Sequence, residues 1–413
     1  MKKSLIALSV AAAVSTGAQA QNVTVTGILD SMYLSGKYFG QSYKEIGQNG
    51  ARTTNVTIRG SEDLGGGLRA NFRFEVQPQL ISGDGNGYNY AIAATGALAA
   101  DRATQTTGQT ALQSGLTGKG YSFVGLSGGF GEVQFGTINS PSFGTYAVSS
   151  GLTGLGTGIG SGYGGSHGII GSSGTNTFTR FENSVMYSSP TINGVTFHAL
   201  TRLGNSSQYG SSTGGTLRRP GVTDFALQYV AGPLTVRGAI LSTKNPGTEA
   251  TTNTSVTPAQ ANLETTTTTL AAGYNFGTVR LGAVVQNVKN DAGATSGNGN
   301  GSNTTTGKID QERVMAHVAV PLGAWRFLAA HGYQTTNEHN VNALEGKKTT
   351  LTGVGAEYDL SKRTFVYARY ETGKANDRQA SSINVNGAAC GAADVACSNG
   401  AFSRMGLGVS HQF

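Results

Sequence analysis

The sequence is poor in charged residues and has no long apolar run after its first twenty positions. Only 12% of its 413 residues are charged, whereas 63 are glycine. A protein that crosses a membrane with helices needs apolar stretches of about 20 residues, and beyond residue 20 the apolar stretches are only a few residues long. A disordered chain has few aromatic residues, whereas this one has 16 Phe and 16 Tyr. These features exclude both classes and indicate an all-β fold.

Cysteine is almost absent. Cys390 and Cys397 are the only two, in a stretch rich in Gly, Ala and Asn. They predict one small disulfide-closed loop in an oxidising compartment. The six histidines are scattered without metal-ligand spacing, and two thiolates alone do not make a zinc set. We therefore expect no metal and no cofactor.

The N-terminus carries an export signal. Residues 1–20 begin with the basic Met1-Lys2-Lys3, continue through a short apolar core and end on Ala18-Gln19-Ala20. This is the pattern of a cleaved secretory signal peptide, whose apolar core is too short to span a bilayer. We expect cleavage after Ala20, which leaves residues 21–413 as a single domain.

The rest of the chain reads as short alternating segments, joined in strict alternation by short turns and long loops. The first segment covers 23–34 and is followed by a long loop; the next two, 55–60 and 68–76, are joined through residues 61–67. A short turn between alternating segments predicts a hairpin. Continued to the end, the pattern gives sixteen strands, seven short turns and eight long loops. That layout is typical of a closed transmembrane antiparallel β-barrel.

Each segment has one apolar and one polar face. In segment 68–76, Phe72 and Phe74 share one side, while Arg69 and Arg73 share the other, as a period of two requires. A soluble β-sandwich or solenoid also alternates, but neither explains why arginine gathers on the polar face or why the loops have two lengths. In lipid, closure of the sheet leaves no unpaired edge. We therefore favour the barrel.

Five stretches, in chain order, resemble the general diffusion porins of Gram-negative outer membranes, in particular the betaproteobacterial type. They are VTVTGILD (23–30), RGSEDLGGGL (59–68), FVGLSGGFG (123–131), NSVMYSSP (183–190) and the C-terminal GVSHQF (408–413). Together they span nearly the whole mature chain.

The resemblance implies a homotrimer of sixteen-stranded barrels in the cell outer membrane. Each barrel would be a water-filled pore for passive diffusion of small ionic or hydrophilic solutes, narrowed by an inward-folded third loop. The resemblance also implies that the barrel assembly machinery recognises the terminal Phe413, and that membrane lipid and lipopolysaccharide surround the barrel. Such a channel is not an enzyme.

The polar faces of the predicted strands carry more positive than negative charge, with eleven arginines against seven carboxylates. Rings of Arg in a narrow lumen favour anions, so we expect an anion-preferring pore. If the charges instead pair across strands, they only keep the lumen wet. The predicted pore-lining residues are Arg59, Arg69, Arg73, Arg180, Arg202, Arg237, Arg280, Arg313, Arg326, Arg369 and Arg404 (basic) and Asp30, Glu75, Glu132, Glu182, Asp224, Glu357 and Glu371 (acidic).

The inward-folding loop is expected over residues 139–179. Its start, Pro141-Ser142-Phe143-Gly144, resembles the family's Pro-Glu-Phe-Gly with a serine in place of the carboxylate. No Asp, Glu, Lys or Arg occurs anywhere between positions 139 and 179. We therefore expect a weak transverse field across the constriction and a more purely anionic selectivity.

Other functions fit the sequence less well. Residues 160–165 match a nucleotide-binding glycine pattern, but they lie in a Gly/Ser-rich loop without the strand and helix that such a site needs. The arginines occur singly at alternate positions rather than in clusters, which argues against a nucleic-acid partner. Nothing favours a Ser-His-Asp catalytic site. Two alternatives remain open, namely a barrel with a structural or adhesive role through its surface loops and a substrate-specific channel.

Overall fold

The computed structural model describes residues 22–38, 41–78, 80, 120–150, 172–173, 176–177, 180–202, 221–245, 263–290, 309–338, 347–374 and 401–413. The predicted signal peptide and both cysteines lie outside these ranges. Within them, no helix is long and apolar enough to cross a membrane.

Most of the described chain is β-strand. The strands of the main sheet are β1 (Asn22–Tyr38), β2 (Gln41–Gln48), β3 (Asn55–Gly65), β4 (Leu68–Val76), β5 (Ser122–Gly128), β6 (Gly131–Asn139), β9 (Arg180–Ser188), β10 (Val195–Arg202), β11 (Gly221–Ala231), β12 (Leu234–Asn245), β13 (Leu263–Asn275), β14 (Arg280–Asn290), β15 (Ile309–Leu322), β16 (Trp325–Glu338), β17 (Lys347–Asp359), β18 (Thr364–Lys374) and β19 (Ala401–Gln412). The helix α3 (Pro141–Ser150) and the small strand pair β7 (Ser172–Ser173) and β8 (Asn176–Thr177) lie between β6 and β9 in the chain.

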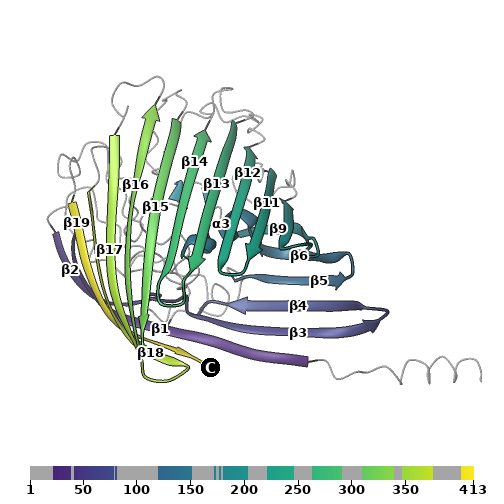
Figure 1. The fold of residues 1–413 in the computed structure, drawn as a ribbon, viewed down its shortest axis with the longest axis horizontal. Coiled ribbons are helices and arrows are strands. Elements are labelled where there is room, and N and C mark those ends of the chain that lie inside the picture. The colour runs from purple at the N-terminus through teal and green to yellow at the C-terminus, as the bar shows by residue number, and fades with distance from the viewer. Residues whose placement is uncertain are drawn as a thin grey trace, which may run out of the picture.

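The sheet closes on itself. Apart from β2 and β3, which both pair with β1, each strand of the main sheet pairs antiparallel with the next one along the chain. The last strand, β19, pairs with β1 from Ile28↔Gln412 to Tyr38↔Phe402. Gly27 and Phe413 complete this seam by exchanging both backbone hydrogen bonds at 3.0 Å. β2 and β3 pair with successive parts of β1 and so share one position in the wall. The seventeen strands of the sheet therefore form a ring of sixteen wall positions. The predicted sixteen-stranded antiparallel barrel is thus confirmed, and Figure 1 shows β11 to β17 side by side in its wall.

One end of the barrel carries the short turns. Two residues separate β3 from β4, β5 from β6, β11 from β12 and β15 from β16. In the first of these turns Gly66 and Gly67 have φ of 62° and 80°, a region that side chains with a Cβ avoid. We call this rim the short-turn end; the chain terminus at Phe413 lies beside it, since Gln412 donates its amide hydrogen to the turn residue Arg363.

The prediction of a long loop directly after residue 34 is wrong. β1 continues to Tyr38, and β2 returns from Gln41, paired with β1 down to Ser31↔Gln48. The sequence did not reveal this hairpin because apolar side chains become sparse after Leu34. Strand ends that project beyond the hydrocarbon layer do not need an apolar face. The predicted turn over 61–67 is also too long, because β3 runs to Gly65.

The wall has its apolar side outward. On β11, Phe225 and Leu227 are 47% and 56% exposed, whereas Asp224 and Ala226, which alternate with them, are 0% and 3% exposed. A water-soluble sheet would bury its apolar face. The reversed arrangement suits lipid outside the barrel and polar side chains within.

Helix α3 lies inside the barrel. It contacts β10 to β15 (Figure 1), and its Tyr146 packs in a buried cluster with the inward-facing Leu241 of β12 and Val284 of β14. Residues 151–171, which continue the loop, lie outside the described residues. The first turns of the expected inward loop are therefore on the inner side of the wall.

Charge placed on the outer face should cost stability in proportion to its depth. Val285, at the middle of β14, is 45% exposed and faces Leu270, which is 57% exposed. Val285→Arg should lower the free energy of unfolding in lipid vesicles by about 2–4 kcal/mol, because a guanidinium at the bilayer midplane loses its hydration.

The matched control is Leu281→Arg, four residues nearer the short-turn end on the same face. There the cost should fall toward about 0–1 kcal/mol, as near a membrane interface. Equal costs in a denaturant titration would contradict the placement of β14 across the bilayer.

Candidate functional site on the inner wall of the barrel

The predicted pore-lining arginines lie in the described strands, on the face opposite the exposed apolar side chains. Arg326 and Arg404, for example, alternate with Phe327 and Met405, which are 45% and 43% exposed. The same alternation places the predicted carboxylates inward except Glu182, and Asp30, Glu75, Asp224, Glu357 and Glu371 are buried. Glu182 is exposed and directly follows Phe181, which lies in the inner buried cluster. Chemically, the inner wall is a set of fixed charges and amides.

A basic cluster occupies β3, β4 and the start of β9. Glu75 accepts Arg73 Nη2 at 2.5 Å and lies 3.7 Å from Arg180 Nη2, so one carboxylate serves two guanidinium groups. Arg59 and Arg73 are direct cross-strand partners, an arrangement of like charges that costs stability. We call Arg59, Arg69, Arg73 and Arg180 the basic patch.

The basic patch keeps much of its positive charge. Arg59 and Arg69 are exposed, and Asp63, the register partner of Arg69, accepts the amide hydrogen of Gly65. Glu132 accepts Asn71 Nδ2 at 3.3 Å. A wall region whose carboxylates are fewer than its arginines attracts anions.

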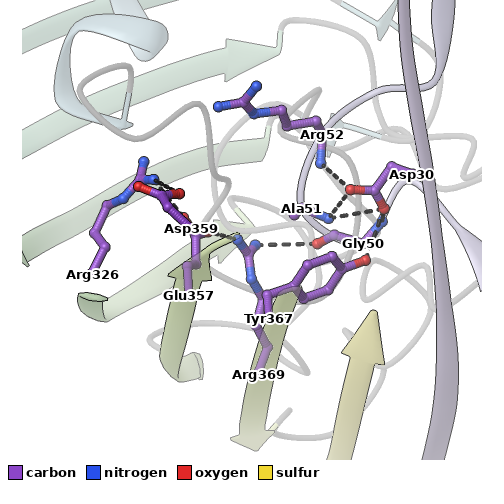
Figure 2. A network of polar contacts seen from close by, with 9 residues as sticks. All are labelled: Asp30, Gly50, Ala51, Arg52, Arg326, Glu357, Asp359, Tyr367 and Arg369. Carbon is purple, nitrogen blue, oxygen red and sulfur yellow. Dashed lines mark hydrogen bonds and ion pairs between the residues drawn. The ribbon is translucent and has the colours of Figure 1, made fainter. Parts of the chain in front are cut away.

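Across β16 to β19, arginines and carboxylates are matched. Glu357, 1% exposed, binds Arg369 Nη2 at 2.5 Å and Arg326 Nη2 at 3.3 Å, while Asp359 lies 3.5 Å from Arg326 (Figure 2). Arg404 Nε donates to Glu371 at 2.6 Å. Such buried charges persist only with partners, so each arginine and carboxylate here depends on the other.

Three of the other predicted arginines, Arg237, Arg313 and Arg202, contact neutral groups. Arg237 donates to Gln228 Oε1 and to the carbonyl of Pro141, both at 3.1 Å, and Arg313 donates to Gln286 at 2.8 Å. Arg202 lies over the ring of Phe181 at 5.4 Å. Arg280 takes an inward position at the start of β14.

The N-terminus of α3 is fixed to the wall by Asp224. The carboxylate accepts the backbone N–H of Ser142 at 2.9 Å and its hydroxyl at 2.7 Å. Ser140 caps the helix by accepting the N–H of Phe143, and a negative charge here suits the helix dipole. Ser142 is 0% exposed, so the position that resembles the family's loop carboxylate here binds a carboxylate on the wall.

A second inward segment, residues 49–54, was missed from the sequence. Asp30 accepts the backbone N–H groups of Gly50 at 2.7 Å and Arg52 at 3.1 Å, and also contacts that of Ala51. The Tyr367 hydroxyl donates to the same carboxylate at 2.8 Å (Figure 2). We call residues 49–54 the latch.

The latch also binds β18, which is separated from β1 only by β19. Arg369 Nη1 donates to the carbonyl of Gly50 at 3.1 Å, and Ala51 is 0% exposed. Asn49, with φ of 65°, turns the chain inward, and its side chain accepts the N–H of Thr54. The dipeptide Asn49-Gly50, a common turn signal, was the one clue in the sequence.

The remaining predictions concern other chemistry. No group of three or more His, Cys, Asp or Glu in the described ranges could hold a metal. The Phe413 side chain is 42% exposed beside the seam. The predicted Cys390–Cys397 loop falls outside the described residues.

Comparison with known proteins gives a consistent set of relatives. A family model described as Gram-negative porin matches residues 7–378. The outer membrane porin protein 32 of Delftia acidovorans is 27% identical, with both chains covered completely. Among solved structures, an anion-selective porin from Comamonas acidovorans superposes with a TM-score of 0.65 at 21% identity, covering 95% of this chain and 100% of that one. The trimer form of the outer membrane protein OmpT of Vibrio cholerae gives 0.59 at 14% identity, covering 96% and 100%.

Asp224→Ala should release the start of α3. Without the acceptor for Ser142, the helix N-terminus loses two buried hydrogen bonds, so chymotrypsin should cut after Phe143 or Tyr146 in the variant while the parent protein resists. Limited proteolysis of the folded protein followed by mass spectrometry measures this. Glu312→Ala, an exposed carboxylate on β15, is the control. Equal resistance of both variants would show that Asp224 does not hold the helix.

Asp30→Ala should destabilise the barrel more than Tyr367→Phe. The first change leaves the N–H groups of the latch without an acceptor, and each buried N–H group without a partner costs about 1–3 kcal/mol. The second change removes one hydrogen bond that contributes about 1 kcal/mol. Guanidinium unfolding in vesicles compares them. If both variants unfold alike, the carboxylate is not the anchor of the latch.

Proposed function

Since this chain belongs to the Gram-negative porin family and is an outer-membrane porin, we propose that the water-filled channel it forms prefers small anions to cations. The observation that carries this preference is the basic patch, whose four arginines outnumber the three neighbouring carboxylates, Asp63, Glu75 and Glu132. A confined wall focuses the field of such charges on a passing ion.

The inner wall supports the preference in a second way. Its carboxylates bind arginines, amides and backbone N–H groups, so their negative charge is balanced within the wall. Arg59 and Arg69 are exposed. The loop start at α3 adds no charge of its own, which suits a weak transverse field in the channel.

We further propose the assembly and the export route. The resemblance to the porin family and the trimer form of the Vibrio cholerae protein support a homotrimer. The signal peptide is removed after Ala20, just before β1 begins at Asn22. In the outer membrane, lipid and lipopolysaccharide surround the apolar belt, Phe413 serves the barrel assembly machinery, and no catalytic reaction takes place.

The direct test is a planar bilayer experiment in a potassium chloride gradient. Each insertion of the purified protein should add three equal conductance steps, and the current should be linear at low voltage. The reversal potential should shift toward the chloride equilibrium potential. A reversal potential on the potassium side would overturn the anion preference. Correctly folded protein without conductance would move the function to the surface loops.

Removing charge from the basic patch should weaken the preference. Arg59→Gln and Arg69→Gln should each lower the chloride-to-potassium permeability ratio by up to about sixfold, because one charge acting across about 8 Å of water changes the entry of each ion about twofold and in opposite directions. Lys289→Gln, which removes an exposed charge on β14, is the control and should leave the ratio unchanged. If all three variants behave alike, the patch does not set the selectivity.

A further inference from the structure

The latch arises from a mismatch in the wall. β2 ends opposite Ser31 and β3 begins opposite Ile28, so the six residues 49–54 face only two residues of β1. The surplus chain must leave the sheet. It turns inward, because its backbone binds Asp30 and Arg369, whose side chains lie on the inner face, and the Tyr367 hydroxyl binds the same Asp30 carboxylate.

The latch has little freedom. A Cβ added at Gly50 would lie 2.2 Å from the Tyr367 hydroxyl and 2.4 Å from the Met32 sulfur. Thr54, 1% exposed, accepts the N–H of Asp30 at 3.0 Å. The latch therefore holds Arg52 at a fixed place inside the barrel.

That place is the short-turn mouth. Arg52 Nη1 lies 3.3 Å from Gln412 Oε1, and its Cζ lies 4.9 Å from the centre of the Phe365 ring. Gln412 binds the turn at Arg363, and Phe365 pairs with Asp359 at the same rim. Phe365 is 4% exposed while its neighbour Val366 is 38% exposed, so Arg52 lies on the inner side.

The charge of Arg52 is not matched there. Within the described residues its guanidinium contacts a neutral amide and an aromatic ring. Asp30 of β1, the carboxylate that the latch binds, accepts three backbone N–H groups and one hydroxyl instead. Figure 2 shows the Arg52 side chain pointing away from Asp30.

We propose that Arg52 is a selectivity-determining residue at the short-turn mouth, where it attracts small inorganic anions into the channel. This inference rests on the proposed function, because it needs a conducting channel. It adds to the basic patch a charge that comes from an inward loop and not from a wall strand.

A charge near one mouth has a signature that a central charge lacks. Its field reaches about 30 Å in 0.01 M salt but only about 3 Å in 1 M salt. Arg52 should therefore act most strongly when the short-turn side faces the dilute solution. The reversal potentials measured on one channel in the two directions of the gradient should differ in magnitude.

The experiment measures both reversal potentials on single inserted channels of the parent protein, Arg52→Gln, Arg52→Lys and Lys362→Gln. Arg52→Gln should reduce the difference between the two directions and lower the chloride-to-potassium permeability ratio by about twofold in one of them. Arg52→Lys keeps the charge and should retain the parent values. Lys362 is exposed in the rim turn between β17 and β18, so its loss should change both values less than Arg52→Gln does; an equal change would contradict a specific role for Arg52.

A parent protein that fails to conduct would overturn the proposed function. A conducting, anion-preferring parent whose two reversal potentials are unchanged by Arg52→Gln would overturn only the role of Arg52. If Arg52→Gln does not fold, Arg52→Cys in a Cys390→Ser, Cys397→Ser background provides a second route. Cationic methanethiosulfonate should restore the parent values and the anionic reagent should lower the ratio further; equal effects of the two reagents would contradict the proposal.

Discussion

Every backbone polar group in the hydrocarbon layer needs a partner within the protein, because lipid offers none. The seam between β1 and β19 meets this requirement, and the exchange of hydrogen bonds between Gly27 and Phe413 carries it to the last residue. Closure then dictates the two faces. Side chains that alternate along each strand must point either to lipid or to the interior, so the apolar positions face outward and the polar positions face inward.

The inward polar side chains are held in place by contacts with one another and with inward segments of the chain. Glu357 and Glu371 bind arginines of neighbouring strands, and Asp224 and Asp30 bind inward segments of the chain. Buried charges of this kind add little net stability, but removing one partner is costly. The same contacts therefore position the inner loops and leave the charge of the exposed arginines available to ions.

The sequence predicted the features that depend on the alternation of inward and outward side chains along each strand. The membrane imposes one rule on every strand, so alternation was sufficient to count sixteen wall positions and to assign Arg326 or Glu357 to the inner face. The β1–β2 hairpin was missed, because its residues extend beyond the layer where the rule applies. The latch was missed for a different reason: its partners, Tyr367 and Arg369, lie more than three hundred positions away. The binding of Ser142 to Asp224, 82 positions apart, is equally invisible to local pattern.

The central claim is that the closed barrel presents an inner wall with a positive excess to a water-filled interior. Anomalous diffraction from crystals soaked separately in bromide and in rubidium tests it most directly, because both ions can be located against the same side chains. The account predicts bromide peaks inside the barrel beside Arg59 and Arg69 and no comparable rubidium peaks along that wall. Rubidium peaks on the inner wall without bromide would contradict it.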